Sequence, residues 1–80
     1  RFVYAIALHD LGHPAKAIAQ LQALLRSVPQ SAEVLLALID YNTELGQRKK
    51  ALGYAKILTQ IAPGNRSYQK LYQDLSKGNP

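Results

Sequence analysis

The chain has 80 residues, no cysteine and a formal net charge of +5. A chain of this length forms one small domain with a thin core, and the lack of cysteine excludes disulfides and thiolate chemistry. No apolar run is long enough to span a bilayer, and no stretch has the charged start and apolar middle of a signal peptide. The composition leaves the cellular compartment undetermined, and the basic excess permits binding to anions without demonstrating it.

The first two segments with helical periodicity cover residues 2–11 and 14–27. One side of the first segment carries Val3, Tyr4, Ala7, Leu8 and Leu11. One side of the second carries Ile18, Leu21, Leu24, Leu25 and Val28. Spacings of three and four place such residues on one side of a helix. Gly12 lies between the segments and suits the left-handed conformation that ends a helix, so a tight turn is predicted there.

Three further helical segments cover residues 32–45, 48–61 and 66–77. Ser31 stands where it can cap the first of them, whose packing side carries Val34, Leu35, Leu38, Tyr41 and Leu45. The next segment carries Ala51, Tyr54, Ala55, Leu58 and Ile61. The last has a narrow apolar stripe of Tyr68, Leu71, Tyr72 and Leu75. Its other faces are polar, as a capping helix requires. The sequence predicts an all-α chain of about five helices.

The residues that delimit these helices recur with a period of 34 residues. Leu11-Gly12 returns as Leu45-Gly46, Lys16-Ala17 as Lys50-Ala51, Leu24 as Leu58, and Pro29 as Pro63. The glycine ends the first helix of each unit, and the small alanine lets the second helix cross it closely. The proline stops the second helix, because it lacks a backbone donor and disfavours helical geometry in the residue before it. Each unit is therefore a helix, a tight turn, a second helix and a stop.

This pattern resembles the tetratricopeptide repeat family. The resemblance covers a single domain of residues 1–80, with repeat one at 1–30, repeat two at 31–64 and a C-terminal capping helix at 65–77. The sequence departs from the family pattern in two places. Where the family commonly has a bulky aromatic residue early in the first helix, this chain has Arg1 in the first unit and Leu35 in the second. Where a small residue usually follows, the second unit has Ile39. The resemblance implies an antiparallel helix-turn-helix array, the start of a right-handed superhelix. The first helix of each repeat and the capping helix, here called first-type helices, would line a concave groove.

The acidic residues all lie on the first-type helices. In the implied array, the places that line the groove are Phe2, Ile6, His9, Asp10, Glu33, Leu36, Asp40, Thr43, Glu44, Lys70 and Asp74. An acidic groove with apolar spots favours an extended or helical peptide that carries basic and apolar side chains. The family's clamp for a carboxylate-ended peptide uses Lys, Asn and Arg in the groove, so that ligand class is not expected here. The alternative that these acids only keep a small array soluble stays open.

The second helices of the repeats, here called second-type helices, carry basic but no acidic residues. The run Arg48, Lys49 and Lys50 opens one of them and forms a convex basic patch. The helix dipole disfavours positive charge at this end. Binding of nucleic acid or lipid is an alternative to plain solvation of this patch. No aromatic residues are interleaved with it, so nucleic acid is not an expected partner.

The stretch HDLGH places His9 and His13 four residues apart, close to the spacing of zinc hydrolases. Such a site needs both histidines on one uninterrupted helix and a third ligand. Gly12 and Pro14 instead put His13 beyond the helix end, so we expect no metal site and no cofactor. The sequence also has no phosphate loop and no nucleophile elbow, and no enzymatic activity is expected.

The first helix begins abruptly with apolar residues, whereas the last is polar on its outer faces. In a solenoid each unit buries a face on its neighbour. We therefore expect a C-terminal fragment of a longer protein, and self-association of the isolated chain through residues 1–25. The sequence predicts a non-catalytic protein-interaction scaffold that binds a partner protein or peptide through the groove. The alternatives are a structural connector that packs against other domains of the parent protein and a self-association module.

Overall fold

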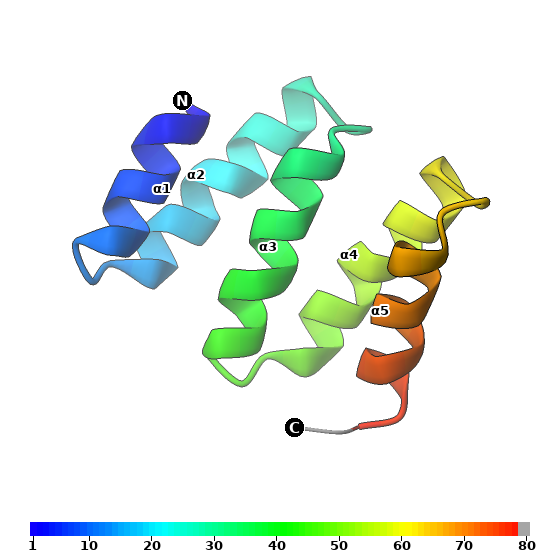
Figure 1. The fold of residues 1–80 in the computed structure, drawn as a ribbon. Helices are drawn as coiled ribbons and strands as arrows, with labels where there is room; N and C mark the ends of the chain where they lie inside the picture. The colour runs from blue at the N-terminus through cyan, green and yellow to red at the C-terminus, as the bar shows by residue number, and fades with distance from the viewer. Residues whose placement is uncertain (79–80) are drawn as a thin grey trace.

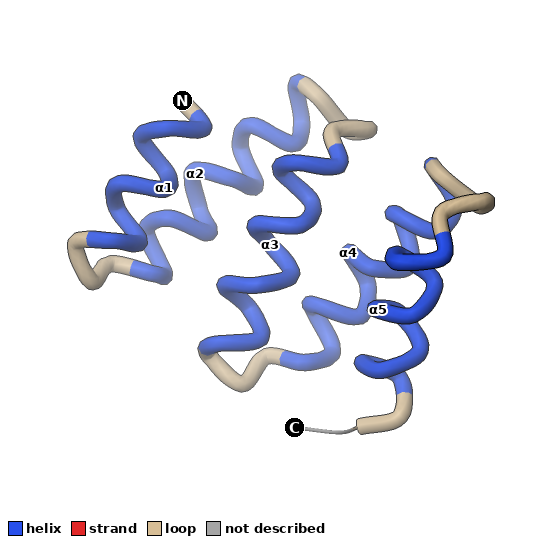
Figure 2. The backbone as a smooth tube through the Cα atoms, viewed as in Figure 1, coloured by secondary structure: helices blue, strands red, loops and turns tan. Residues whose placement is uncertain are grey.

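A computed structural model of the chain describes residues 1–78, and the last two residues of the predicted domain 1–80 lie outside the described residues. Its helices are α1 (Phe2–Asp10), α2 (Pro14–Ser27), α3 (Ala32–Glu44), α4 (Arg48–Ile61) and α5 (Arg66–Ser76). Figure 2 shows helices joined by short loops, and residues 1–78 contain no strand. The prediction of an all-α chain of about five helices is confirmed. Each helix begins at the predicted residue and ends at the predicted residue or one residue before it.

Both predicted glycine turns end a first-type helix in the left-handed conformation. Gly12 has φ +87° and Gly46 has φ +74°. The amide after each glycine donates a hydrogen bond to the carbonyl oxygen five residues earlier, from His13 to Leu8 at 2.9 Å and from Gln47 to Asn42 at 2.8 Å. These bonds satisfy carbonyl groups that a helix end leaves free, so the backbone itself closes each turn.

Side chains cap the starts of α3 and α5. The Ser31 hydroxyl accepts a hydrogen bond from the Val34 amide at 3.3 Å, as predicted, and the Asn65 side-chain oxygen accepts one from the Tyr68 amide at 3.0 Å. Such caps typically stabilise a helix by about 1 kcal/mol. The second-type helices α2 and α4 each end two residues before the predicted proline. Local chemistry therefore sets where the helices begin and end.

The helices form two layers. In Figure 1, α1, α3 and α5 lie nearer the viewer, and α2 and α4 lie behind them. Each helix packs against the next one in the chain, and the Cα atoms extend over 31 × 27 × 16 Å. A slab of this thickness leaves most side chains in contact with solvent, so the core is thin. None of the described helices is long and apolar enough to cross a membrane.

Two clusters of buried side chains hold the layers together. The first consists of Ala5, Ala17, Ile18, Leu21, Val34, Ala37, Leu38 and Tyr41. The second consists of Leu35, Ile39, Ala51, Ala55, Leu58 and Leu75. The helix α3 contributes to both clusters, so it joins the two repeats. Ala17 and Ala51, the predicted crossing residues, are completely buried.

The predicted apolar side of α1 is wrong for most of its residues. Val3, Tyr4 and Leu11 are 77%, 56% and 74% exposed. Instead, Ala5 is buried and Ile6 packs against the first cluster. The helix α1 is apolar around most of its circumference, so periodicity does not distinguish one side from the other. The positions of α2 and α3 determine which side is buried.

Candidate functional site

A groove of about 590 Å³ lies along the first-type helices. It is lined by His9, Asp10, Ile39, Asp40, Tyr41, Thr43, Glu44, Leu71 and Leu75. These residues come from α1, α3 and α5, so the groove exists only where the three helices are held side by side. We refer to it below as the groove.

The structure brings together five of the eleven predicted groove residues. Those that line the groove are His9, Asp10, Asp40, Thr43 and Glu44. Three others are exposed elsewhere on α3 and α5, namely Glu33, Lys70 and Asp74. The remaining three are half-buried and pack against the core clusters, namely Phe2, Ile6 and Leu36. The acidic part of the predicted site therefore gathers at the end of α3, and the apolar spots contribute to the core instead.

Sequence reasoning missed the groove residues Ile39, Tyr41, Leu71 and Leu75. It assigned Tyr41, Leu71 and Leu75 to packing sides. A packed side chain can still present one edge to a groove: Tyr41 and Leu75 remain 7% and 8% exposed. One signal was available, because Ile39 is bulky at a position where the family usually has a small residue. Ile39 belongs to the second cluster and also lines the groove.

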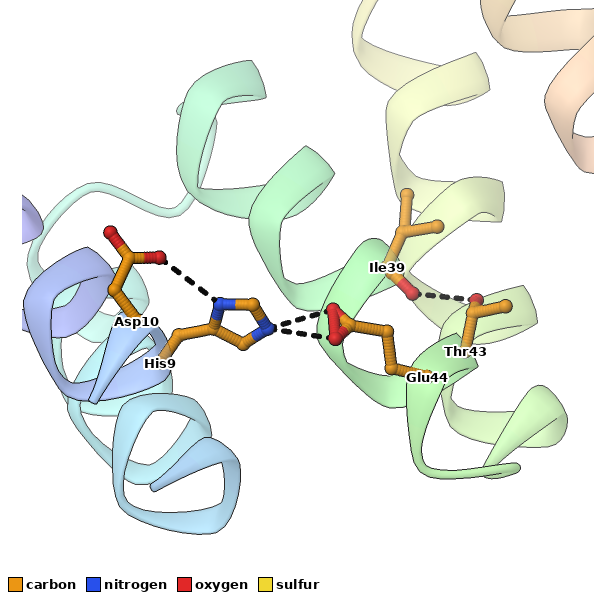
Figure 3. Close-up of polar contacts among 5 residues, drawn as sticks. All are labelled: His9, Asp10, Ile39, Thr43 and Glu44. Atoms are coloured by element: carbon orange, nitrogen blue, oxygen red, sulfur yellow. Dashed lines mark hydrogen bonds and ion pairs between the residues drawn. The ribbon is translucent and has the colours of Figure 1, made fainter. Parts of the chain in front are cut away.

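His9 links α1 to α3, as Figure 3 shows. Its Nε2 lies 2.8 Å from each carboxylate oxygen of Glu44, and its Nδ1 lies 3.5 Å from Oδ1 of Asp10. The ring stacks on Tyr41 with centroids 3.9 Å apart and an interplanar angle of 2°. Only the imidazolium form can donate from both nitrogens, so two carboxylates on opposite sides of the ring favour the charged form.

Three pKa shifts in the groove reflect its carboxylates together with burial. The hydrogen bond to Glu44 raises the pKa of His9 above its ordinary value of 6.5, while burial opposes this and Asp10 adds to it. Burial raises the pKa of Asp40, and the charge of Glu44 raises it further. Burial also raises the pKa of Tyr41, with added contributions from the three carboxylates. All three shifts have the sign expected where carboxylates are concentrated.

The polar side chains of the groove are three carboxylates, one imidazole, one phenol and one aliphatic hydroxyl. The described residues contain no group of three side chains suited to hold a metal ion. His13 lies beyond α1, at the N-cap of α2, as the glycine turn predicts. The Thr43 hydroxyl donates to the Ile39 carbonyl oxygen at 2.7 Å, so it is engaged within its own helix. Carboxylates above an apolar floor can hold a cationic group and an aliphatic one side by side.

The predicted basic patch lines a separate surface hollow of about 450 Å³, together with Gly46 and Gln47. Arg48, Lys49 and Lys50 are all exposed there. No acidic residue lies on α2 or α4. The positive charge of the second-type helices is therefore kept apart from the acidic groove.

Two helix-turn-helix units with a common period, a closing helix and a groove along the first-type helices define a helical repeat protein. The family model for the Tetratricopeptide repeat matches residues 1–41, which include α1, α2 and most of α3. The chain therefore belongs to the tetratricopeptide repeat family. No curated protein and no solved structure matches it. The family generally mediates protein–protein interactions, and its repeats are typically non-catalytic scaffolds.

Proposed function

We propose that the chain is a non-catalytic interaction module that binds a peptide segment of a partner protein in the groove. The observation that supports this is the composition of the groove lining, in which Asp10, Asp40 and Glu44 surround an apolar floor. The segment that fits this lining carries a basic side chain next to an aliphatic one. Carboxylates steer the encounter and set specificity, and apolar contacts supply most of the affinity.

The state of Asp40 argues for a cationic ligand. Within residues 1–78 this carboxylate makes no ion pair, and both burial and the nearby charge of Glu44 raise its pKa. Two neighbouring carboxylates disfavour each other's charged forms, and a cation held between them would relieve that cost. From α5, Leu71 and Leu75 offer apolar surface to the rest of the segment.

Reversal of the groove charge is expected to abolish binding of a basic and apolar peptide. The probe is an acetylated, fluorescein-labelled peptide of alternating arginine and leucine, and binding is followed by fluorescence anisotropy. The double variant Asp40→Lys, Glu44→Lys should bind it at least about tenfold more weakly, because like charges then face each other across the interface. Both positions are exposed and lie outside the core clusters, so circular dichroism should show that the helices are retained, although Glu44→Lys also removes the contact with His9.

The matched control is Glu33→Lys, Asp74→Lys, which changes the net charge equally on exposed residues outside the groove. It should retain most of the affinity. An equal loss in both double variants would mean that the peptide responds only to overall charge, and the groove would not be its site.

The exposed side of α1 favours self-association as a second function. One period of 34 residues later, Leu38 stands at the position equivalent to Tyr4, and Tyr41 at the position equivalent to Ala7. Both Leu38 and Tyr41 are buried in the first cluster. The helix α1 thus exposes the side that α3 uses for packing against the preceding unit. No large apolar side chain of α5 is exposed. Pairing of two copies would therefore be symmetric, with the α1 helices in contact.

Self-association through α1 predicts a mass that depends on concentration. In sedimentation equilibrium the unmodified chain should approach the mass of a dimer as concentration rises, because Tyr4 and Leu11 lose their contact with water. The variant Tyr4→Lys, Leu11→Lys should stay monomeric. The control Val28→Lys alters a residue that is 41% exposed and lies outside α1, and it should still associate. An unmodified chain that remains monomeric at the highest concentration would exclude this function.

A further inference from the structure

The contact between His9 and Glu44 joins the two repeats across the groove, and its strength depends on a proton. We propose that His9 is a proton-controlled clasp. When charged, it occupies Glu44 and ties α1 to α3; when neutral, it leaves the full negative charge of the groove to a basic partner. This inference rests on the proposed function of the groove and specifies how that function is regulated.

His9 already occupies the position in the groove that a basic side chain of a partner would take. Its Nε2 lies 2.8 Å from both oxygens of Glu44, as an arginine or lysine of a partner would, and its ring lies flat on Tyr41. The side chain is 24% exposed and belongs to the groove lining. A basic partner that approaches Glu44 must therefore compete with a group that the chain itself supplies.

The groups around His9 come from a small set of elements. Its own helix supplies Asp10, and α3 supplies Asp40, Tyr41 and Glu44. The helix α5 contributes only leucines to the groove lining, and α2 contributes no residue to it. Every charged side chain that lines the groove with His9 is therefore a carboxylate, so none of them opposes its protonation.

The two protonation states differ in charge and in hydrogen bonding. The imidazolium donates toward Glu44 and Asp10 at once and cancels one of the three carboxylate charges of the groove. After loss of the proton, one ring nitrogen carries a lone pair, and this nitrogen faces a carboxylate. One of the two contacts then becomes unfavourable, and α1 is held less firmly to α3. The groove gains one negative charge at the same time.

Stability and affinity should therefore change in opposite directions with pH. The hydrogen bond to Glu44 raises the pKa of His9 in the folded chain above the ordinary value of 6.5. The contribution of the clasp to stability is fully present below 6.5 and is lost as pH rises through the folded pKa. The affinity of the groove for a basic peptide rises over that same interval.

The clasp is tested first by NMR titration of the His9 ring. Glu44→Gln should lower the pKa of His9 toward its ordinary value, because the amide cannot stabilise the charged ring as a carboxylate does. A pKa of His9 that does not respond to Glu44→Gln would overturn the proposal.

Gating is tested with the arginine–leucine peptide described above, at constant ionic strength. The unmodified chain should bind it about threefold to fivefold more tightly at about pH 8 than at about pH 5.5. His9→Gln should remove this difference, and His13→Gln should keep it. Equal pH dependence in His9→Gln would overturn the gating alone. Absence of binding at both pH values would overturn the proposed function and the gating with it, and the NMR titration would still show whether the clasp forms.

Discussion

Leu38→Ala is expected to lower the free energy of unfolding by about 3 kcal/mol. Leu38 is completely buried in the first cluster, where side chains of α1, α2 and α3 meet. Its truncation removes apolar contacts and leaves a cavity that a two-layer array cannot easily refill. A domain of this size has only about 5 to 10 kcal/mol of stability, so the loss is a large part of the total. Urea unfolding followed by circular dichroism measures it.

The control for this variant is Leu11→Ala, which removes the same atoms from a residue that is 74% exposed. We expect the free energy of unfolding to change by less than about 0.5 kcal/mol. Similar losses in the two variants would mean that the first cluster does not hold the array together. A loss restricted to Leu38→Ala would agree with the role of α3 as the helix that joins the repeats.

The helix ends could be predicted from the sequence because each depends on local chemistry. Gly12 and Gly46 have positive φ, which other residues adopt only at a cost, and Ser31 caps its own helix. These effects involve residues within a few positions of one another. The 34-residue period then relates one unit to the next, so the order and type of the helices follow.

The buried sides were less predictable where a helix lacks a polar face. The helix α1 has apolar residues on nearly all sides, so its exposed side depends on where α2 and α3 lie. Leu45 is 43% exposed although periodicity assigns it to a packing side. It is the C-cap residue of α3, where the chain turns away from the core. Both outcomes depend on tertiary position, which a periodic pattern does not contain.

The groove was partly predictable because two of its three carboxylates, Asp40 and Glu44, lie on one side of α3. The contact of His9 with Glu44 joins residues 35 positions apart and depends on how the repeats stack. The period does contain a hint, since it aligns His9 with Thr43 and Asp10 with Glu44. Corresponding positions of adjacent first-type helices lie side by side, so His9 and Glu44 become neighbours. The stacking of His9 on Tyr41 has no comparable signal in the sequence.

Ala17→Leu is expected to destabilise the chain by about 2 kcal/mol, because a larger side chain cannot fit where α1 and α2 cross. Ala17 is completely buried, whereas Ala19 lies two residues further along the same helix and is exposed. Ala19→Leu adds the same atoms at a position that faces solvent, so it should change the stability little. Thermal unfolding of the two variants measures the difference, and equal transition temperatures would contradict close packing at this crossing.

The repeat extends this expectation to the second unit. Ala51 occupies the place of Ala17 one period later and is also completely buried. If the two units cross their helices in the same way, Ala51→Leu should cost about as much as Ala17→Leu, roughly 2 kcal/mol. A much smaller cost at Ala51 would mean that the second crossing is looser. The two units would then have equivalent turns but different packing between their helices. The shared groove depends on the equivalence of the two units.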